Sequence, residues 1–297
     1  MSFFSTYSKK LENLIAGILF LVTFAIYFST MAPTVSFWDT GEFIATSHIL
    51  GIPHPPGSPL FLLIGKLFTL IPISSDIAFR MNIFSPLISA ATVSLLFFIC
   101  NQFIDRLDSR DDIKDFKIWS SLTASLTFAF THSHWFNAVE TEVYAFSGFM
   151  TALVVYLILI WSKYKDEAHS AMYLIGIVYV IGLATGVHLL NLLTIPFIGL
   201  ILYFSTSKFS FKGLCITLGL SLLTLIIIQN GIIKGFPAIV SQIGFLGLLF
   251  FLAVLLYFLY SSIINKKTLL SLICTSLLLI IVGYSTYFAI FIRSGQD

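Results

Sequence analysis

The sequence NLIAGILFLVTFAIYFSTMA, residues 13–32, decides the fold class, because it runs for 20 residues without a charged side chain. A helix needs about 20 consecutive apolar residues to cross the hydrocarbon core of a bilayer. The run follows Lys9 and Lys10 and lacks a small-residue cleavage site, so we expect a retained anchor helix. Similar runs follow along the chain, and the expected spans are 13–32, 82–104, 118–134, 138–162, 171–187, 189–206, 213–233, 237–262 and 268–291.

The composition gives the same class. Of the 297 residues, 58% are hydrophobic and 10% are charged, and the mean hydropathy is +0.97. Soluble domains are about 45–50% apolar and about 25% charged. The net charge of +2 indicates no nucleic-acid partner. Cys100, Cys215 and Cys274 all lie inside apolar runs, so no disulfide framework is expected. The sequence predicts an all-α polytopic membrane protein with about nine transmembrane helices, forming a single domain over residues 1–297.

The segment PLFLLIGKLFTLIP, residues 59–72, decides the orientation. It is short and carries Lys66 near its centre, where a lysine would cost about 2.5–3.5 kcal/mol on insertion scales. If it lies in the membrane interface, 12 of the 16 basic residues fall on inner segments. If it crosses, the later basic loops move outside, against the positive-inside rule. We therefore predict an inner N-terminus and an outer C-terminus. The 12 inner residues are Lys9, Lys10, Arg106, Arg110, Lys114, Lys117, Lys163, Lys165, Lys208, Lys212, Lys266 and Lys267.

Residues 33–81 then form a long first outer loop, ahead of the remaining spans in 82–291. Long ordered loops are usually functional. Thr40 can cap a short interfacial helix with Glu42 in its first turn, where a carboxylate suits the helix dipole. The prolines of PHPPG, residues 53–57, then enforce an extended turn. The loop is therefore expected to be rigid and held at the membrane surface.

Five side chains of this loop are candidates for a site. Asp39 and Glu42 share a face if they lie in one helical turn, and such a pair can supply a general base or bind a hard cation. Their alternative role is as N-terminal helix acids. His54 is either a site residue or a turn filler. Arg80 suits a phosphate clamp or a membrane-edge anchor, and Lys66 can extend to the interface.

A second group of candidates lies in THSHWFNAVETEVYAF, residues 131–146. His132 and His134 have an H-x-H spacing, which can bind a metal ion if the backbone is extended there. This pair is a weak metal candidate, because the spacing alone is not specific. We expect Glu140 and Tyr144 to stand at i and i+4 on the next helix.

On that helical reading, Glu142 points away from Glu140. An acidic side chain at the outer mouth of a span is a functional candidate, with interfacial hydration as the alternative. His188 is a pocket residue or a packed, capping histidine, and Arg293 adds a cation on the outer side. No phosphate-binding loop, dinucleotide fingerprint, zinc spacing or nucleophile elbow is present.

The motifs and their order resemble a known family. A basic inner N-terminus, one span, and an outer loop with an early Asp and a Pro-rich turn resemble the GT-C superfamily of glycosyltransferases that use lipid-phosphate sugars. More narrowly, the chain resembles a family, formerly a domain of unknown function, that includes the endoplasmic-reticulum protein O-mannosyltransferase of plexin-type receptors. The motifs that carry this resemblance are SFWDTGEFIATSHILGIPHPPGSPLFLLIGKLF, AFRMNIFSPL, VETEVYAF and GLATGVHLLNLL.

The resemblance implies an activity and a site. It implies transfer of a monosaccharide, with mannose the expected sugar, from a polyprenyl-phosphate donor to Ser or Thr hydroxyls of an acceptor protein. The GT-C pattern places the catalytic carboxylate on Asp39, with Glu42 as second choice. Such proteins generally continue further, so we expect a short member or an N-terminal fragment. No cofactor follows with certainty, and a divalent metal stays an open option.

The residues themselves allow this chemistry. A polyprenyl phosphate leaves readily if nearby cations stabilise it, and the candidates for donor binding are His54, Arg80, Lys66, Glu140, Tyr144, His188 and Arg293. Without a covalent carrier, the transfer would invert the anomeric carbon. The alternatives are a transporter or flippase, and a non-catalytic scaffold. The expected membrane is a bacterial inner membrane, or the endoplasmic reticulum in a eukaryotic host.

Overall fold

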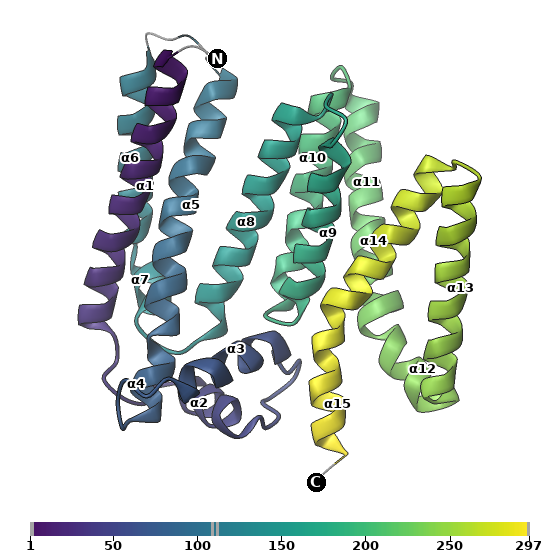
Figure 1. Cartoon of the computed structure of the whole chain (residues 1–297), viewed down its shortest axis with the longest axis horizontal. Coiled ribbons are helices and arrows are strands. Elements are labelled where there is room, and N and C mark those ends of the chain that lie inside the picture. The colour runs from purple at the N-terminus through teal and green to yellow at the C-terminus, as the bar shows by residue number, and fades with distance from the viewer. Residues whose placement is uncertain (1–2, 108–109, 111–112, 296–297) are drawn as a thin grey trace. The chain divides into compact units, whose positions relative to one another are not determined.

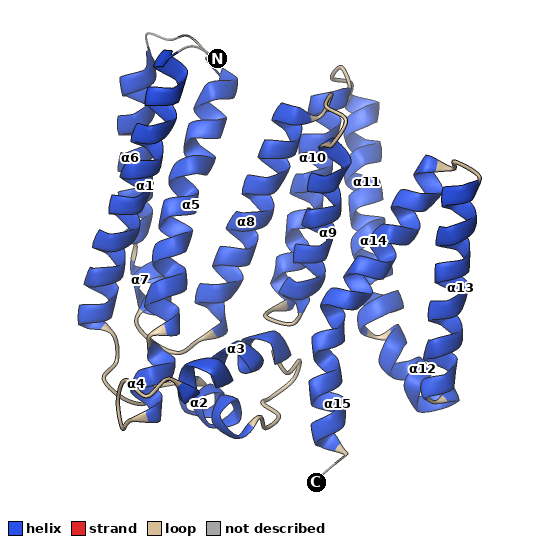
Figure 2. Ribbon diagram, viewed as in Figure 1, coloured by secondary structure: helices blue, strands red, loops and turns tan. Residues whose placement is uncertain are grey.

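The computed structural model describes residues 3–107, 110 and 113–295, and within them every regular element is a helix (Figure 2). The chain forms two compact units. The first comprises the described part of residues 1–156 and 288–297, and the second comprises residues 157–287. The helical class is therefore confirmed, and the expectation of one domain over 1–297 stays a prediction.

The first unit is a helical bundle with short helices at one end. Figure 1 shows α1, α5 and α6 side by side, and α2, α3 and α4 gathered where α1 ends and α5 begins. The helices of this unit are α1 (Phe3–Thr30), α2 (Thr40–Ile49), α3 (Pro59–Leu70), α4 (Ile77–Asn82), α5 (Phe84–Leu107), α6 (Lys114–Ala129), α7 (His132–Ala138), the start of α8 (Val143–Tyr164) and α15 (Phe288–Ser294).

Small residues let the bundle helices approach closely. Ala16 on α1, Ala90 on α5 and Ala129 on α6 are all buried in one cluster. Close contact through small residues is the usual way in which membrane helices pack, because lipid provides no hydrophobic driving force. Tyr27 is fully buried and donates a hydrogen bond to the carbonyl of Ala129 at 2.8 Å, which joins α1 to the end of α6. The short helices at this end are therefore held on a rigid frame.

The second unit is built on one close helix pair. Gly182 on α9 and Gly283 on α14 lie in backbone contact, since a Cβ atom on Gly283 would be 2.4 Å from the carbonyl carbon of Gly182. The elements of this unit are the end of α8, α9 (Ser170–Thr185), the 3-10 helix η2 (Leu189–Leu193), α10 (Thr194–Thr206), α11 (Phe211–Ile227), the π-helix η3 (Ile228–Ile233), α12 (Gly235–Ile243), α13 (Phe245–Ile264), α14 (Thr268–Tyr284) and the 3-10 helix η4 (Ser285–Tyr287).

The number of helices able to span a membrane is seven among the described residues, not nine. The expected spans 118–134 and 171–187 form α6 and α9, which have 16 residues each. At 1.5 Å per residue each is about 24 Å long, short of the roughly 30 Å core. The seven are Lys9–Thr30, Ile77–Leu107, Val143–Tyr164, Leu189–Thr206, Phe211–Ile243, Leu246–Ile264 and Thr268–Ser294. The chain is a polytopic membrane protein.

Helix α3 agrees with the expectation that residues 59–72 do not cross. It has 12 residues, about 18 Å, and its Phe61 is fully buried. Figure 1 shows it at the end of the bundle, next to α2, and not alongside α1 and α5. The first long loop is thus an ordered layer of short helices.

Candidate active site

Asn82 brings the distant parts of the site together. This residue is fully buried at the end of α4, and its Nδ2 donates to the carbonyls of Ala32 at 2.8 Å and Thr34 at 2.9 Å. Its Oδ1 accepts from the hydroxyl of Thr141 at 2.5 Å. The backbone N–H of Ala32 also donates to the carbonyl of Val139 at 2.8 Å. These bonds hold the segment before α2 against the segment before α8, more than 100 positions further on.

Asp39 stands at the start of α2 with its carboxylate exposed. It occupies the N-cap position, yet its side chain makes no capping hydrogen bond. Thr40, expected to be the cap, is the first helical residue and is fully buried beside Ser36. The preceding residue, Trp38, is exposed and has φ of 59°, a left-handed conformation that is costly for a bulky side chain. Such strain is concentrated at functional sites.

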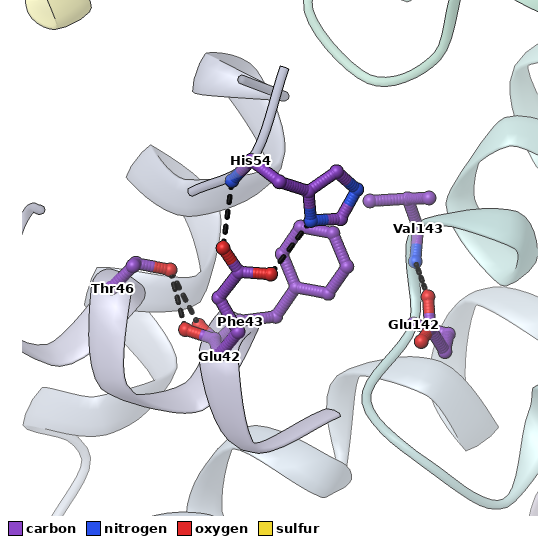
Figure 3. A network of polar contacts seen from close by, with 6 residues as sticks. All are labelled: Glu42, Phe43, Thr46, His54, Glu142 and Val143. Carbon is purple, nitrogen blue, oxygen red and sulfur yellow. Dashed lines mark hydrogen bonds and ion pairs between the residues drawn. The ribbon is translucent and has the colours of Figure 1, made fainter. Parts of the chain in front are cut away.

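Glu42, three residues beyond Asp39, forms an ion pair with His54. One oxygen of Glu42 accepts from the backbone N–H of His54 at 2.7 Å, and the other lies 2.6 Å from its Nδ1 (Figure 3). The hydrogen bond from His54 lowers the pKa of Glu42, and the same bond raises the pKa of His54. Asp39, Glu42 and His54 each offer one ligand atom, and these three atoms lie within 4.8 Å of one another. The sequence predicted each residue, but only the fold pairs them.

Turns of unusual backbone conformation place His54. Leu50 ends α2 with φ of 53°, Ser58 precedes α3 with φ of 41°, and Gly57 has φ of 105°. A Cβ atom on Gly57 would also meet the side chain of Ile290 at 2.3 Å. Glycine is the residue that adopts a positive φ without strain. The Pro-rich turn is therefore a fixed support for His54, as expected from its prolines.

Glu140 lies in the segment between α7 and α8, with 5% of its surface exposed. Its Oε2 accepts from the hydroxyl of Ser36 at 2.8 Å, and its Oε1 is buried with no hydrogen-bond partner in the described part of the chain. Burial raises the pKa of the Glu140 carboxyl, and the Ser36 bond opposes this effect. The expectation that Glu140 and Tyr144 share a helix was wrong, because α8 begins only at Val143.

Glu142 is the residue that the sequence reasoning missed. It is 6% exposed, and one oxygen accepts from the backbone N–H of Val143 at 3.3 Å. The pKa of Glu142 is raised to about 7, mainly by burial, with smaller contributions from the charges of Asp39 and Glu140. Figure 3 shows its carboxyl group at the N–H of Val143, in the same close-up as Glu42 and His54. If this segment were helical, Glu142 would point away from Glu140, as expected from the sequence. The backbone here is not helical, and Glu142 lies close to the other carboxylates.

Lys66 and Arg80, two of the candidates for donor binding, both bond to backbone carbonyls in this structure. The ammonium of Lys66 donates to the carbonyl of His48 in the last turn of α2. The guanidinium of Arg80 donates to the carbonyls of Ser74 at 2.5 Å and Thr69 at 2.9 Å. Cations commonly satisfy the free carbonyls of helix ends in this way. Both side chains therefore hold the loop together, and a role for them in binding the donor phosphate stays a prediction.

The prediction that His132 and His134 bind a metal ion is also corrected. His132 and His134 lie on α7, where residues two apart point in different directions. The ring of His132 lies against Phe136, while the ring of His134 packs on Phe128 with centroids 4.2 Å apart. The extended backbone that a shared metal would need is absent from this described segment, so the structure does not support this pair as a metal site.

Three remaining candidates lie elsewhere. Tyr144 is half exposed in the first turn of α8. His188 belongs to the second unit, where its Nδ1 accepts from the N–H of Leu190 at 3.2 Å and caps η2. Arg293 on α15 reaches the carbonyl of Ile49 at 3.5 Å. It lines an apolar pocket of ≈ 230 Å³ in the first unit, with Leu50, Gly51, Pro59, Leu62, Leu63, Ala289, Ile290 and Ile292.

The arrangement suits proton transfer and cation binding beside an apolar surface. Four carboxylates and one imidazole gather at one end of a membrane-helix bundle, and the pKa of one carboxyl is close to neutral. Clusters whose members have pKa values shifted apart are typical of acid–base sites. The fold and the cluster define a polytopic helical membrane protein with a carboxylate–histidine site.

Comparison with known protein families identifies the family of this chain. The family model described as the protein O-mannosyl-transferase TMEM260 N-terminal domain matches residues 39–210, more than half of the chain, and begins at Asp39. The chain belongs to this family. The resemblance expected from the motifs is therefore confirmed.

Two named relatives are similar over part of their length. The chain is 26% identical over 193 residues to protein O-mannosyl-transferase tmem260 of Dictyostelium discoideum, covering 61% of this chain and 22% of that protein. It is 31% identical over 134 residues to protein O-mannosyl-transferase TMEM260 of Mus musculus, covering 45% of this chain and 17% of that protein. The matched regions thus span about a fifth of each relative. No solved structure matches the chain.

Proposed function

We propose that this chain carries the catalytic membrane part of a protein O-mannosyltransferase. It transfers mannose from polyprenyl-phosphate mannose to Ser or Thr hydroxyls of an acceptor protein, on the outer or lumenal face of the membrane. The names of its relatives support the activity. The single observation that carries the proposal is the uncapped carboxylate of Asp39, held beside the Glu42–His54 pair at the exposed end of the bundle.

The proposed reaction is a single displacement with Asp39 as the general base. The acceptor oxygen attacks the anomeric carbon of mannose, and the bond from that carbon to the phosphate oxygen breaks. The electron pair leaves with the polyprenyl phosphate, and the hydroxyl proton passes to Asp39. One displacement gives inversion at the anomeric carbon. Glu42 is less suited to take the proton, because both of its oxygens are bonded to His54.

The surroundings supply a place for the lipid. The apolar pocket beside Arg293 opens between α3 and α15, next to the turn that carries His54. An isoprenoid chain can lie on such a surface while its phosphate stays near the polar groups. In this proposal the N-terminus is cytoplasmic, and the membrane is a bacterial inner membrane or the endoplasmic reticulum.

The test is transfer of label from radiolabelled polyprenyl-phosphate mannose to protein in membranes that contain the chain. We expect Asp39→Asn to reduce transfer at least a hundredfold at equal expression, because the base is removed. The matched control is Asp166→Asn, which changes an exposed acid of an inner loop and should leave transfer unchanged. Transfer that survives Asp39→Asn would move the base to Glu142. Transport of the lipid without any transfer would favour a flippase, and neither activity would favour a scaffold.

A further inference from the structure

The carboxylates of the site lack a matching positive charge in the described part of the chain. Asp39, Glu140 and His54 all act electrostatically on Glu142, so these groups share one small volume. Glu42 is bonded to His54, which is the one basic side chain in this set of contacts. The basic residues of the same loop donate to backbone carbonyls instead. The acidic groups of this cluster outnumber its one basic side chain, which favours the binding of a cation beside them.

We infer that Asp39, Glu42 and His54 form a binding site for one divalent cation, with Mn²⁺ as the representative ion. Two ligand atoms on the same ion can be separated by at most twice the metal–ligand bond length. With bonds of about 2.1–2.4 Å, this limit is about 4.2–4.8 Å. The three ligand atoms lie within 4.8 Å of one another, so they can meet one ion with little movement.

The choice of ion follows from the donor set. Carboxylate oxygens suit Mg²⁺, Ca²⁺ and Mn²⁺, whereas an imidazole nitrogen suits transition metals. An ion that accepts both is therefore favoured over Mg²⁺ or Ca²⁺ alone. The hydrogen bond from the backbone N–H of His54 also holds Glu42 close to His54 in advance, which reduces the entropy lost when an ion replaces the proton between their side chains.

A second observation points to a missing ligand independently of these three residues. Glu140 is 5% exposed, and its Oε1 has no hydrogen-bond partner among the described residues. Buried polar atoms without a partner are uncommon and call for an unseen water or ion. The other oxygen of Glu140 is tied to Ser36, which also contacts Thr40, the residue after Asp39. Ser36 therefore links the carboxyl group of Glu140 to the start of α2, where Asp39 stands.

The role of the ion deepens the proposed function and rests on it. Three protein ligands leave positions of an octahedral ion for water and for phosphate oxygens. A cation there would bind the donor phosphate and stabilise the charge that develops on it as the sugar leaves. Lys66 and Arg80 instead donate to backbone carbonyls in the positions found here. Because a carboxylate has two oxygens, Asp39 can bind the ion with one and accept the acceptor proton with the other.

The experiment measures Mn²⁺ binding to the purified chain in lipid nanodiscs, without donor or acceptor, by titration calorimetry and by electron paramagnetic resonance. We expect one saturable site per chain. His54→Ala and Glu42→Gln should each weaken binding at least tenfold, and Mn²⁺ should raise the thermal midpoint of the wild type but not of these variants. The matched control is His169→Ala, which breaks another exposed His–Glu pair, at 3.2 Å, that belongs to no three-ligand group among the described residues.

The outcomes separate the two proposals. No saturable binding, or equal weakening in His54→Ala and His169→Ala, overturns the metal site. A variant that loses binding but keeps its metal-free thermal midpoint is folded, so its loss counts for the site. Mn²⁺ binding without mannose transfer would support the site and reject the proposed function. Mannose transfer that is unaffected by EDTA, in a chain that binds no Mn²⁺, would support the proposed function and reject the metal site.

Discussion

Glu42 accepts two hydrogen bonds from His54, one from the backbone N–H at 2.7 Å and one from the ring Nδ1 at 2.6 Å. The residues are 12 positions apart, and the end of α2 and the Pro-rich turn lie between them. The contact therefore closes a loop, and it links the first turn of α2 to the segment that leads into α3. Electrostatics and loop conformation are coupled at this point of the site.

Removing the charge of Glu42 should lower the pKa of His54. Glu42 raises the pKa of His54, and its own pKa is lowered by the same pair. The stabilisation from His54 is complete below its ordinary pKa and is lost as the pH rises through the raised value. The stabilisation from Glu42 is lost as the pH falls through its lowered pKa, so the pair is strongest between the two.

In Glu42→Gln we expect the titration of His54 to move to lower pH, toward about 6.5. Histidine-selective NMR of the chain in nanodiscs, recorded without metal, measures this midpoint. Asp166→Asn, a substitution in an exposed loop, is the control and should leave the midpoint in place. An unchanged midpoint in Glu42→Gln would contradict the pairing.

Glu142 should make the stability of the folded chain depend on pH. Its pKa is raised to about 7 in the folded state, mainly by burial. Between its ordinary pKa and this value, the folded state keeps a proton that the unfolded state has lost. Stability therefore falls as the pH rises through this interval, by up to about 1.4 kcal/mol per pH unit. Above about pH 7 the contribution no longer changes.

Glu142→Gln removes this titration, so the thermal midpoint of the variant should vary less between pH 5 and pH 7 than that of the wild type. The quantity to compare is the difference between the thermal midpoints of wild type and variant at each pH. Contributions from the other titrating groups are the same in both proteins and cancel in this difference. Parallel profiles would show that Glu142 is not perturbed by the fold.

Asn82→Ala should destabilise the first unit by about 2–4 kcal/mol. The substitution leaves the carbonyls of Ala32 and Thr34 and the hydroxyl of Thr141 without their partner, and each buried unsatisfied group costs about 1–3 kcal/mol. The control is Asn137→Ala, whose side chain bonds only to the carbonyl of Ser133 one turn earlier in α7. Denaturation midpoints measure both, and similar losses in the two variants would argue against the role of Asn82.

Gly283→Ala should separate α9 from α14. The added Cβ would lie 2.4 Å from backbone atoms of Gly182, and backbone cannot move aside as a flexible side chain can. We expect a loss of about 1–3 kcal/mol, typical of overpacked interfaces. Gly176→Ala is the matched control on α9, because its Cβ would meet nothing within 4 Å. Equal thermal midpoints for the two variants would show that the helix contact tolerates a methyl group.

Local sequence patterns are sufficient to assign the class of the protein and the segment that carries its site. Apolar runs dictate membrane helices because the backbone must satisfy its own hydrogen bonds in lipid. The glycine and prolines around His54 dictate a rigid turn because they restrict or permit specific φ values. These are local effects, so they can be read from neighbouring residues. Asp39, Glu42 and His54 were candidates for the same reason.

Only the tertiary structure decided which side chains meet. In the segment before α8, Ala32 binds the carbonyl of Val139 and Asn82 binds the hydroxyl of Thr141. This segment is not helical, so the expected i to i+4 spacing of Glu140 and Tyr144 on one helix does not form. Lys66 and Arg80 bond to backbone carbonyls, although their sequence positions suggested a phosphate clamp. Such contacts join residues far apart in the chain, and no local period or propensity encodes them. They depend on packing, which exists only once the helices have come together.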